Sequence, residues 1–168
     1  MIKRLVVGET YTLREETAPY GYLKEADISF TVEDTENIQS VVMKDEVPTG
    51  AIIVNKDGEF ITDKDSMNGH WYDFVFNYFK KSLAGVTFEV YAKEDIVSPD
   101  GLDTVYYKAD ELVETIVTDD RGIATLEKLP LGKYYLVETK TIEGFVLDSA
   151  PIMADLSYVD QNTSVVYA

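Results

Sequence analysis

Hydrophobic and polar positions alternate along most of this chain, in short segments that are separated by residues typical of turns. Alternation with a period of two is typical of a β-strand that buries one face and exposes the other. Many such segments at short spacing predict an all-β protein built as an antiparallel sandwich. We expect strands at residues 2–7, 9–15, 26–33, 39–45, 51–56, 86–92, 112–118, 123–127, 133–139, 151–158 and 163–168.

Two short segments predict how these strands are connected. TDDRG at 118–122 predicts a hairpin turn, because aspartate and glycine favour tight turns. EVPTG at 46–50 predicts a linker, because proline and glycine interrupt the sheet pattern before a new apolar strand begins.

One segment, HWYDFVFNYFKKSLAG at 70–85, fits two secondary structures. As a strand, it would line one face with aromatic residues, namely Tyr72, Phe74, Phe76 and Tyr78. As a helix, it would carry a polar stripe of Asp73, Asn77 and Lys81, with Lys80 and Lys81 near its C-terminal end and Gly85 just beyond. We expect a short amphipathic helix, within an insertion around residues 66–84, whose aromatic side chains pack in the core.

The chain contains an internal repeat. RLVVGETYTLREETAPYGYL at 4–23 aligns with KLPLGKYYLVETKTIEGFV at 128–146, with one gap after the glycine. The matched pairs are Gly8 with Gly132, Leu13 with Leu136, Glu15 with Glu138, Gly21 with Gly144 and Tyr22 with Phe145, and downstream Val41, Val42 and Met43 match Val165, Val166 and Tyr167.

The repeated piece is the last part of a domain, which predicts the domain organisation. We expect residues 1–48 to be the C-terminal part of one domain, and residues 49–168 to be a nearly complete second domain. Half a sandwich leaves apolar faces and strand edges open. Residues 1–48 are therefore expected to pack on the second unit or to associate with another copy of the chain.

Two glutamates lie at positions where the alternation predicts a buried side chain. Tyr134, Leu136 and Glu138 share one face of their strand. The repeat places Glu15 in the same way, in line with two apolar residues of the first unit. An inward carboxylate at matching places in both units predicts a specific role.

A lysine and an aspartate have the same inward placement. Lys56 shares a face with the apolar residues Ile52 and Val54, and Asp45 shares a face with Val41 and Met43, while Lys44 points away. Burial disfavours charge on amines and carboxyl groups alike. A neutral amine is a nucleophile, and a protonated carboxyl group can polarise a carbonyl and relay protons.

Composition and charge exclude several function classes. The formal net charge of −16 argues against a nucleic-acid partner, whose phosphates the protein would repel, and against an anionic membrane surface. The chain has no cysteine, which excludes disulfides, thiolate metal sites and cysteine nucleophiles. No apolar run approaches membrane-spanning length, and the first residues lack the apolar core of a signal peptide, so a secreted origin predicts a longer parent protein.

Motifs for enzyme chemistry are also missing. The single histidine, His70, cannot form a histidine cluster for a metal, and any Ser–His triad would need it. No phosphate-binding glycine loop and no HExxH motif occur. DKDSMNG at 63–69 has a faint similarity to a calcium loop, but Met67 and Asn68 occupy the positions of an acidic residue and a glycine. We therefore expect no enzymatic activity, no cofactor and no metal.

Three segments, ETYTLREETAPYGY, GVTFEVYAKED and TDDRGIATLEKLPLGKYYLVETKTIEGF, resemble the Cna B-type, or SpaA-like, domains of Gram-positive surface proteins and pilins. The resemblance covers nearly the whole chain. It implies a prealbumin-like β-sandwich used as a stacked stalk module in a cell-wall-anchored, extracellular protein. The implied partners are neighbouring domains of the same surface protein. The alternative is an adhesin module that binds a host protein or glycan through the aromatic insertion.

Many domains of this kind form a spontaneous intramolecular isopeptide bond. A lysine on the first strand is joined to an asparagine or aspartate on the last strand, and a glutamate on an intervening strand assists. By resemblance, Lys56 and Glu138 take these roles in the second unit, and Glu15 and Asp45 are the glutamate and the acceptor of the first.

Neither unit holds all three residues in this chain, so the alternative is that Glu15 and Glu138 hydrogen-bond the backbone or water and that no such bond forms here. The first strand of the first unit, with its lysine, is absent, and the position that matches Asp45 in the second unit falls one residue beyond Ala168. Inward periodicity of Val165 and Tyr167 points to that same position. Asp160 and Asn162 are the fallback acceptors, although the repeat places them in the turn before the last strand.

Overall fold

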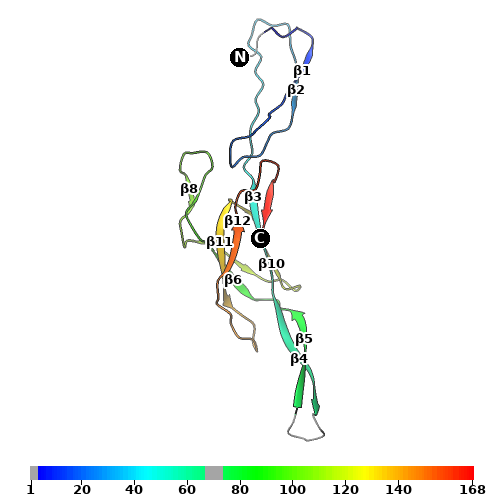
Figure 1. The fold of residues 1–168 in the computed structure, drawn as a ribbon, viewed down its shortest axis with the longest axis vertical. Coiled ribbons are helices and arrows are strands. Elements are labelled where there is room, and N and C mark those ends of the chain that lie inside the picture. The colour runs from blue at the N-terminus through cyan, green and yellow to red at the C-terminus, as the bar shows by residue number, and fades with distance from the viewer. Residues whose placement is uncertain (1–3, 67–73) are drawn as a thin grey trace.

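The structure is a computed structural model that describes residues 4–66 and 74–168. These residues form thirteen strands and no helix. The molecule is elongated, with β1 and β2 near one end, a sandwich in the middle and the β4–β5 hairpin at the other end (Figure 1). The strands are β1 (Thr10–Leu13), β2 (Ile28–Thr31), β3 (Thr49–Asn55), β4 (Asp57–Ser66), β5 (Phe74–Ser82), β6 (Thr87–Ala92), β7 (Ile96–Val97), β8 (Val105–Tyr107), β9 (Leu112–Val117), β10 (Ile123–Leu129), β11 (Gly132–Lys140), β12 (Ile152–Leu156) and β13 (Val165–Tyr167).

The predicted sandwich consists of two sheets. One has the strand order β10-β3-β13 and the other the order β12-β11-β6-β9. All neighbouring strands are antiparallel, except that β13 runs parallel to β3. The buried side chains between the sheets form one core, which includes Ile52, Phe88, Val90, Tyr134, Leu136 and Leu156.

Strand β11 lies inside its sheet, between β12 and β6, and shows how the alternation builds the core. Tyr134, Leu136 and Glu138 are buried, while Tyr135 and Val137 between them are only partly buried. On β3, Ile52 is buried and Val54 packs against the core cluster. The inward positions that the pattern predicts on both strands are therefore confirmed.

The helix expected within 70–85 is wrong. Residues 74–82 form strand β5, which pairs antiparallel with β4, and the insertion is a long hairpin. Phe79 lies opposite Phe60 with ring centroids 5.5 Å apart, and Tyr78 lies opposite Ile61. Aromatic and β-branched side chains favour a strand with such cross-strand partners, and this pairing outweighs the polar stripe on which the helix prediction rested.

The expected burial of the aromatic side chains in this segment is also wrong for Phe76 and Tyr78. Phe76 and Tyr78, which the strand alternative places on one face, are about half exposed. His70, Tyr72 and Asp73, and the end of the calcium-like segment, lie outside the described residues.

The predicted turn at 118–122 is present, but it does not close a hairpin. The N–H of Gly122 donates to the carbonyl of Asp119 (2.8 Å), and Gly122 has a φ of +71°. The strands on either side, β9 and β10, belong to different sheets. Turn residues determine that the chain reverses, whereas the pairing partners depend on the packing of the two sheets.

The N-terminal unit contains one antiparallel pair, β1 with β2, in which Tyr11 lies opposite Phe30. Residues 4–7 and 39–45, which were expected to be strands, form no ladder. The alternation of residues 41–45 persists nevertheless, since Val41, Met43 and Asp45 are half-buried and the residues between them are exposed.

Candidate functional site

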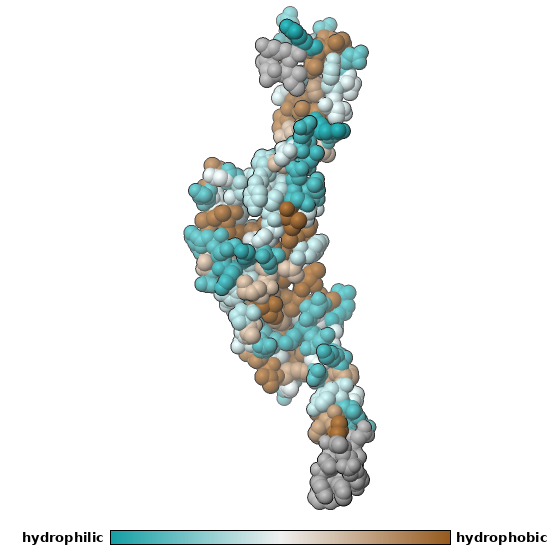
Figure 2. Space-filling view, in the orientation of Figure 1, coloured by the Kyte–Doolittle hydropathy of each residue, from teal (hydrophilic) through white to brown (hydrophobic). Residues whose placement is uncertain are grey.

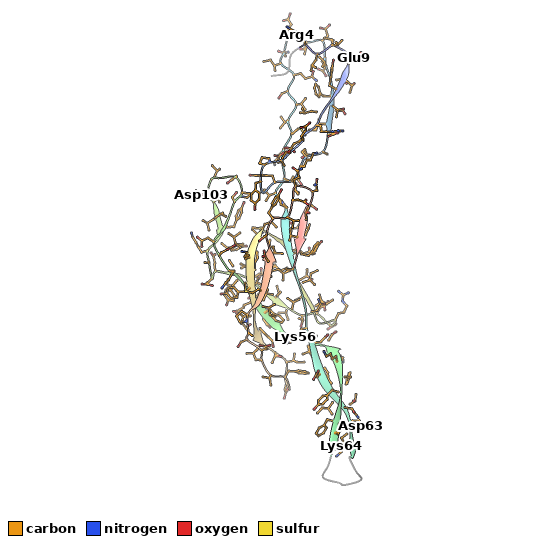
Figure 3. All side chains as sticks on the ribbon, in the orientation of Figure 1. Arg4, Glu9, Lys56, Asp63, Lys64 and Asp103 are labelled. Carbon is orange, nitrogen blue, oxygen red and sulfur yellow. The ribbon has the colours of Figure 1, made fainter. Side chains whose placement is uncertain are left out.

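Lys56 and Glu138 meet at one end of the sandwich. Lys56 directly follows β3, and Glu138 lies on β11 opposite Phe88 of β6. The Nζ atom of Lys56 is 2.7 Å from Oε2 of Glu138. The side chain of Glu138 is only 2% exposed, and that of Lys56 is 25% exposed. The structure thus brings together the two residues that the sequence predicts for the second unit. Figure 3 labels Lys56, near the point where the hairpin leaves the sandwich.

The backbone of Lys56 is fixed from two sides. Its N–H donates to the carbonyl of Gly122 (2.8 Å), and its carbonyl accepts from the N–H of Leu83 (2.9 Å). A Cβ atom on Gly122 would lie 2.6 Å from the carbonyl oxygen of Lys56, so this position needs glycine for space as well as for its positive φ. The turn after β9 and the end of the hairpin therefore hold the lysine in place.

The carboxylate of Glu138 is incompletely satisfied. Its Oε1 atom is buried and, in the part of the chain that the structure describes, has no hydrogen-bond partner. A buried acceptor without a donor is costly, and such atoms are rare in proteins. The arrangement provides an amine, a carboxyl group within proton-transfer distance of it, and a buried carboxylate oxygen, Oε1 of Glu138, that can still accept a hydrogen bond.

The last strand leads toward this pair. Val165 lies beside Thr49, and Tyr167 lies beside Ala51. Ala168 continues the ladder, because its N–H donates to Ala51 (3.0 Å) and its carbonyl accepts from Ile53 (3.0 Å). Each further residue along this line would lie beside the next residue of β3, in the direction of Lys56.

The inward face of β13 differs from the expected one. Val166 packs against the core cluster, whereas Tyr167 is 65% exposed. Cross-strand neighbours share a face, and Val166 lies beside Gly50, whose Cβ would meet Leu156. The prediction that Val165 and Tyr167 point inward is therefore wrong. If the alternation continues from Val166, the next inward position after Ala168 would be the second residue beyond it, not the first.

The fallback acceptors lie far from the lysine. Asp160 and Asn162 form a turn before β13, in which Oδ1 of Asp160 accepts from the N–H of Asn162 (2.7 Å). That hydrogen bond, followed by the one from Thr163, holds the pKa of Asp160 below its ordinary value. Because β13 begins beside Thr49, seven residues before Lys56, the turn is about 20 Å from the amine.

The predicted glutamate of the N-terminal unit has a backbone partner. Glu15 is half-buried, and its Oε2 accepts from the backbone N–H of Glu25 (2.9 Å). Among the described residues, no hydrogen bond or ion pair joins Glu15 to Asp45. In this chain Glu15 fixes a loop.

Sequence reasoning missed Thr118, a buried residue next to the lysine site. Its hydroxyl donates to the carbonyl of Leu83 (2.7 Å) and accepts from the N–H of Val86 (3.0 Å). Leu83 in turn binds the backbone of Lys56. The signal was available, because Thr118 continues the inward alternation of Ile116 at the end of β9.

Residues 4–66 and 74–168 contain no group of three histidine, cysteine, aspartate or glutamate side chains placed to hold a metal ion. Within the same ranges, no helix is long and apolar enough to cross a membrane.

Comparison with protein families identifies residues 1–47 and 77–167 as matches to the SpaA family, described as a prealbumin-like fold domain. This match and the all-β structure confirm the resemblance and the fold class that the sequence predicts. No curated protein matches the chain.

Several solved structures are similar, among them the three that follow. The Bacillus anthracis TIE protein matches 95% of this chain at 19% identity with a TM-score of 0.55, and the chain spans 24% of its length. The SpaB basal pilin from Lactobacillus rhamnosus GG matches 71% of the chain over 93% of its own length, at 20% identity and a TM-score of 0.40. GBS52, the minor pilin of Streptococcus agalactiae, matches 99% of the chain over 61% of its own length, at 19% identity and a TM-score of 0.40. At 19% identity, the likeness to the TIE protein concerns the fold alone.

Proposed function

The chain belongs to the SpaA family of prealbumin-like domains, and we propose that it is a structural stalk module of a Gram-positive cell-wall-anchored surface protein or pilin. In this function it is extracellular and has no catalytic turnover. Its partners are the neighbouring domains of the same protein. The unit of residues 1–48 and the sandwich of residues 49–168 are successive modules of that stalk.

The observation that carries this proposal is the end-to-end arrangement of the two units. β1 and β2 lie beyond one end of the sandwich along the long axis, so the units form a rod (Figure 1). They are connected by the short segment around Pro48, which is buried. Hydrogen bonds also join them, since the N–H of Lys24 donates to the carbonyl of Gln161 (2.9 Å).

We further propose that Lys56 and Glu138 are prepared for an isopeptide bond with an asparagine or aspartate that follows Ala168. In that reaction the neutral amine of Lys56 attacks the side-chain carbonyl of the acceptor. Glu138 receives the amine proton and transfers it to the leaving group. One C–N bond forms and one C–N or C–O bond breaks, with loss of ammonia from asparagine or of water from aspartate.

Intact-protein mass spectrometry tests this bond. The chain extended by the residues that follow Ala168 in its parent protein is expected to weigh less than its sequence by one ammonia or one water. The matched control Lys56→Arg keeps the charge but not the reactive amine, and its mass should equal the sequence mass. An extended chain of full mass that carries an asparagine or aspartate at the second added position would refute the bond but leave the stalk proposal standing.

A second function, that of an adhesin module, is favoured by one observation. The hairpin presents Ile61, Phe76 and Tyr78 to solvent on a projecting ribbon, and exposed aromatic residues are enriched in binding sites. Binding of the chain to an array of glycans and immobilised extracellular matrix proteins tests it. Binding that Tyr78→Ser abolishes, while the exposed control Leu112→Ser does not, would support this function.

A further inference from the structure

Two turns in this chain have the same backbone structure. In the N-terminal unit the N–H of Tyr22 donates to the carbonyl of Pro19 (3.1 Å), and in the sandwich the N–H of Phe145 donates to the carbonyl of Ile142 (3.2 Å). The third residue of each turn is a glycine with a positive φ, +88° in Gly21 and +89° in Gly144. The internal repeat aligns these same positions. The two turns are therefore equivalent parts of two modules.

In the N-terminal unit this turn is covered by the sandwich. The N–H of Ala18 donates to Oε1 of Gln161 (2.9 Å), and the N–H of Lys24 donates to the carbonyl of Gln161 (2.9 Å). The hydroxyl of Tyr158 donates to the carbonyl of Tyr22 (3.2 Å).

Side chains complete this contact. The rings of Tyr20 and Tyr158 meet edge to face with centroids 4.8 Å apart. A Cβ atom on Gly21 would lie 2.4 Å from Cβ of Pro99, so the turn backbone touches the sandwich directly. The loop 17–24 is thus the docking surface by which the first module sits on the second.

The equivalent loop of the sandwich, residues 141–147, is uncovered. A Cβ atom on Gly144 would meet nothing within 4 Å. Val146 is 92% exposed, although Leu23 at the matching position is half-buried, and Leu147 is 44% exposed. The loop lies between β11 and β12 at the end of the sandwich away from β1 and β2, where Figure 2 shows hydrophobic side chains on the surface.

The base of the hairpin borders this loop. The ring of Phe145 packs edge to face on that of Phe60, with centroids 5.1 Å apart. A Cβ atom on Gly58 would lie 2.4 Å from the ring of Phe145. The hairpin continues beyond the loop along the long axis (Figure 1). Phe79, opposite Phe60, is partly exposed on the face of the hairpin that borders the loop.

We propose that loop 141–147, bordered by the hairpin face that carries Phe79, is the docking surface for a further SpaA-like module. The loop of that module equivalent to residues 158–162 accepts a hydrogen bond from the N–H of Leu147, as Gln161 accepts one from Lys24. The loop of that module equivalent to the one that carries Pro99 covers Gly144, as Pro99 covers Gly21. Val146 is buried in this contact. The inference rests on the stalk function, because it extends the contact observed between the two units to the next module.

A tandem protein tests this surface with the chain's own residues as the probe. The alignment matches Ala168 with Lys44, so residues 45–168 are fused directly after Ala168 to reproduce the connection between the two units. The second copy carries Thr139→Ser, which gives its peptides a distinct mass. Deuterium uptake of loop 141–147 is then measured separately in the two copies, and the uncovered loop of the second copy is the internal control.

We expect the loop of the first copy to exchange about tenfold more slowly than that of the second, because its amides are covered. Val146→Glu in the first copy should abolish this protection, whereas Leu112→Glu, on an exposed strand position, should not. Equal exchange in both copies, with Ala18 and Lys24 still protected, would overturn the docking surface alone. Rapid exchange at Ala18 and Lys24 would overturn the stacking of modules and with it the stalk proposal.

Discussion

Replacing Lys56 by methionine tests the buried pair directly. Lys56→Met keeps most of the aliphatic chain but removes the amine that lies 2.7 Å from Oε2 of Glu138. Because Oε1 of Glu138 already has no hydrogen-bond partner among the described residues, the variant leaves the whole carboxylate without a donor. The core around it is apolar, with Phe88 opposite and Leu136 two residues away on the same face.

The size of the effect follows from burial. Removing one partner of a fully buried ion pair costs about 3–5 kcal/mol, because an uncompensated charge remains. Lys56 is 25% exposed, so water can enter the vacated position, and we expect a loss below that range, about 2–3 kcal/mol. This is a large share of the roughly 5–15 kcal/mol by which a domain is stable.

The assay is urea unfolding of the wild type, Lys56→Met, Glu138→Leu and the double variant. The double variant removes the amine and the carboxylate together, so its free energy of unfolding should return to within about 1 kcal/mol of the wild type. Lys108→Met is the matched control, because Lys108 pairs with Asp95 at 3.0 Å on the surface and its loss should be much smaller. Small, additive effects of the two single variants would refute the reasoning that the pair is coupled.

Two further predictions concern the module contact and alkaline pH. Gly21→Ala should speed hydrogen exchange at the contact between the units, because its methyl group collides with Pro99. Gly144→Ala, with nearly the same φ but open space around it, should not, and equal effects would contradict this. Burial, and to a smaller extent the charge of Tyr107, raises the pKa of Tyr134 above its ordinary value. The unfolded chain therefore loses this proton first, and stability should fall as pH rises above about 10. Tyr134→Phe removes the hydrogen bond to the carbonyl of Pro130 (2.6 Å), but its stability should fall less steeply with pH above about 10, because the titrating hydroxyl is gone. The same pH dependence of stability in the variant and the wild type would contradict the role of Tyr134.

The sequence predicts the sandwich well where one face of a strand is buried. On β11 and β3 the two-residue period identifies the core side chains, because each strand lies between two neighbours and packs on the opposite sheet. The pair of Lys56 and Glu138 could be found in the same way, since a polar residue at an inward position stands out against apolar neighbours.

The hairpin was harder to predict, for a physical reason. Strand β4, with the sequence DGEFITDKDS, carries little apolar periodicity, because the ribbon packs on the core only at its base. Without a visible partner strand, the aromatic residues of β5 were equally compatible with a helix. The predicted inward face of β13 was wrong for a different reason. With three residues in the strand, a shift of one residue reverses every side chain, and only the parallel pairing with β3 places Val166 inward.

The parallel pairing of β3 and β13 makes the end of β3 a suitable place for the proposed crosslink of the proposed stalk. The sandwich in such a stalk is pulled at the start of β3 and past the end of β13, so the two neighbouring strands are loaded in shear. A bond from Lys56 to a side chain shortly after Ala168 would pass the tension from one strand directly to the other. It would close a loop of roughly a hundred residues, which by the chain-entropy argument for disulfides stabilises by about 4–5 kcal/mol. The chain between Lys56 and the acceptor, the hairpin included, would then lie outside the path of the force. An insertion directly after the lysine could therefore project from the module without weakening the stalk, and the mass measurement on the extended chain decides whether this bond exists.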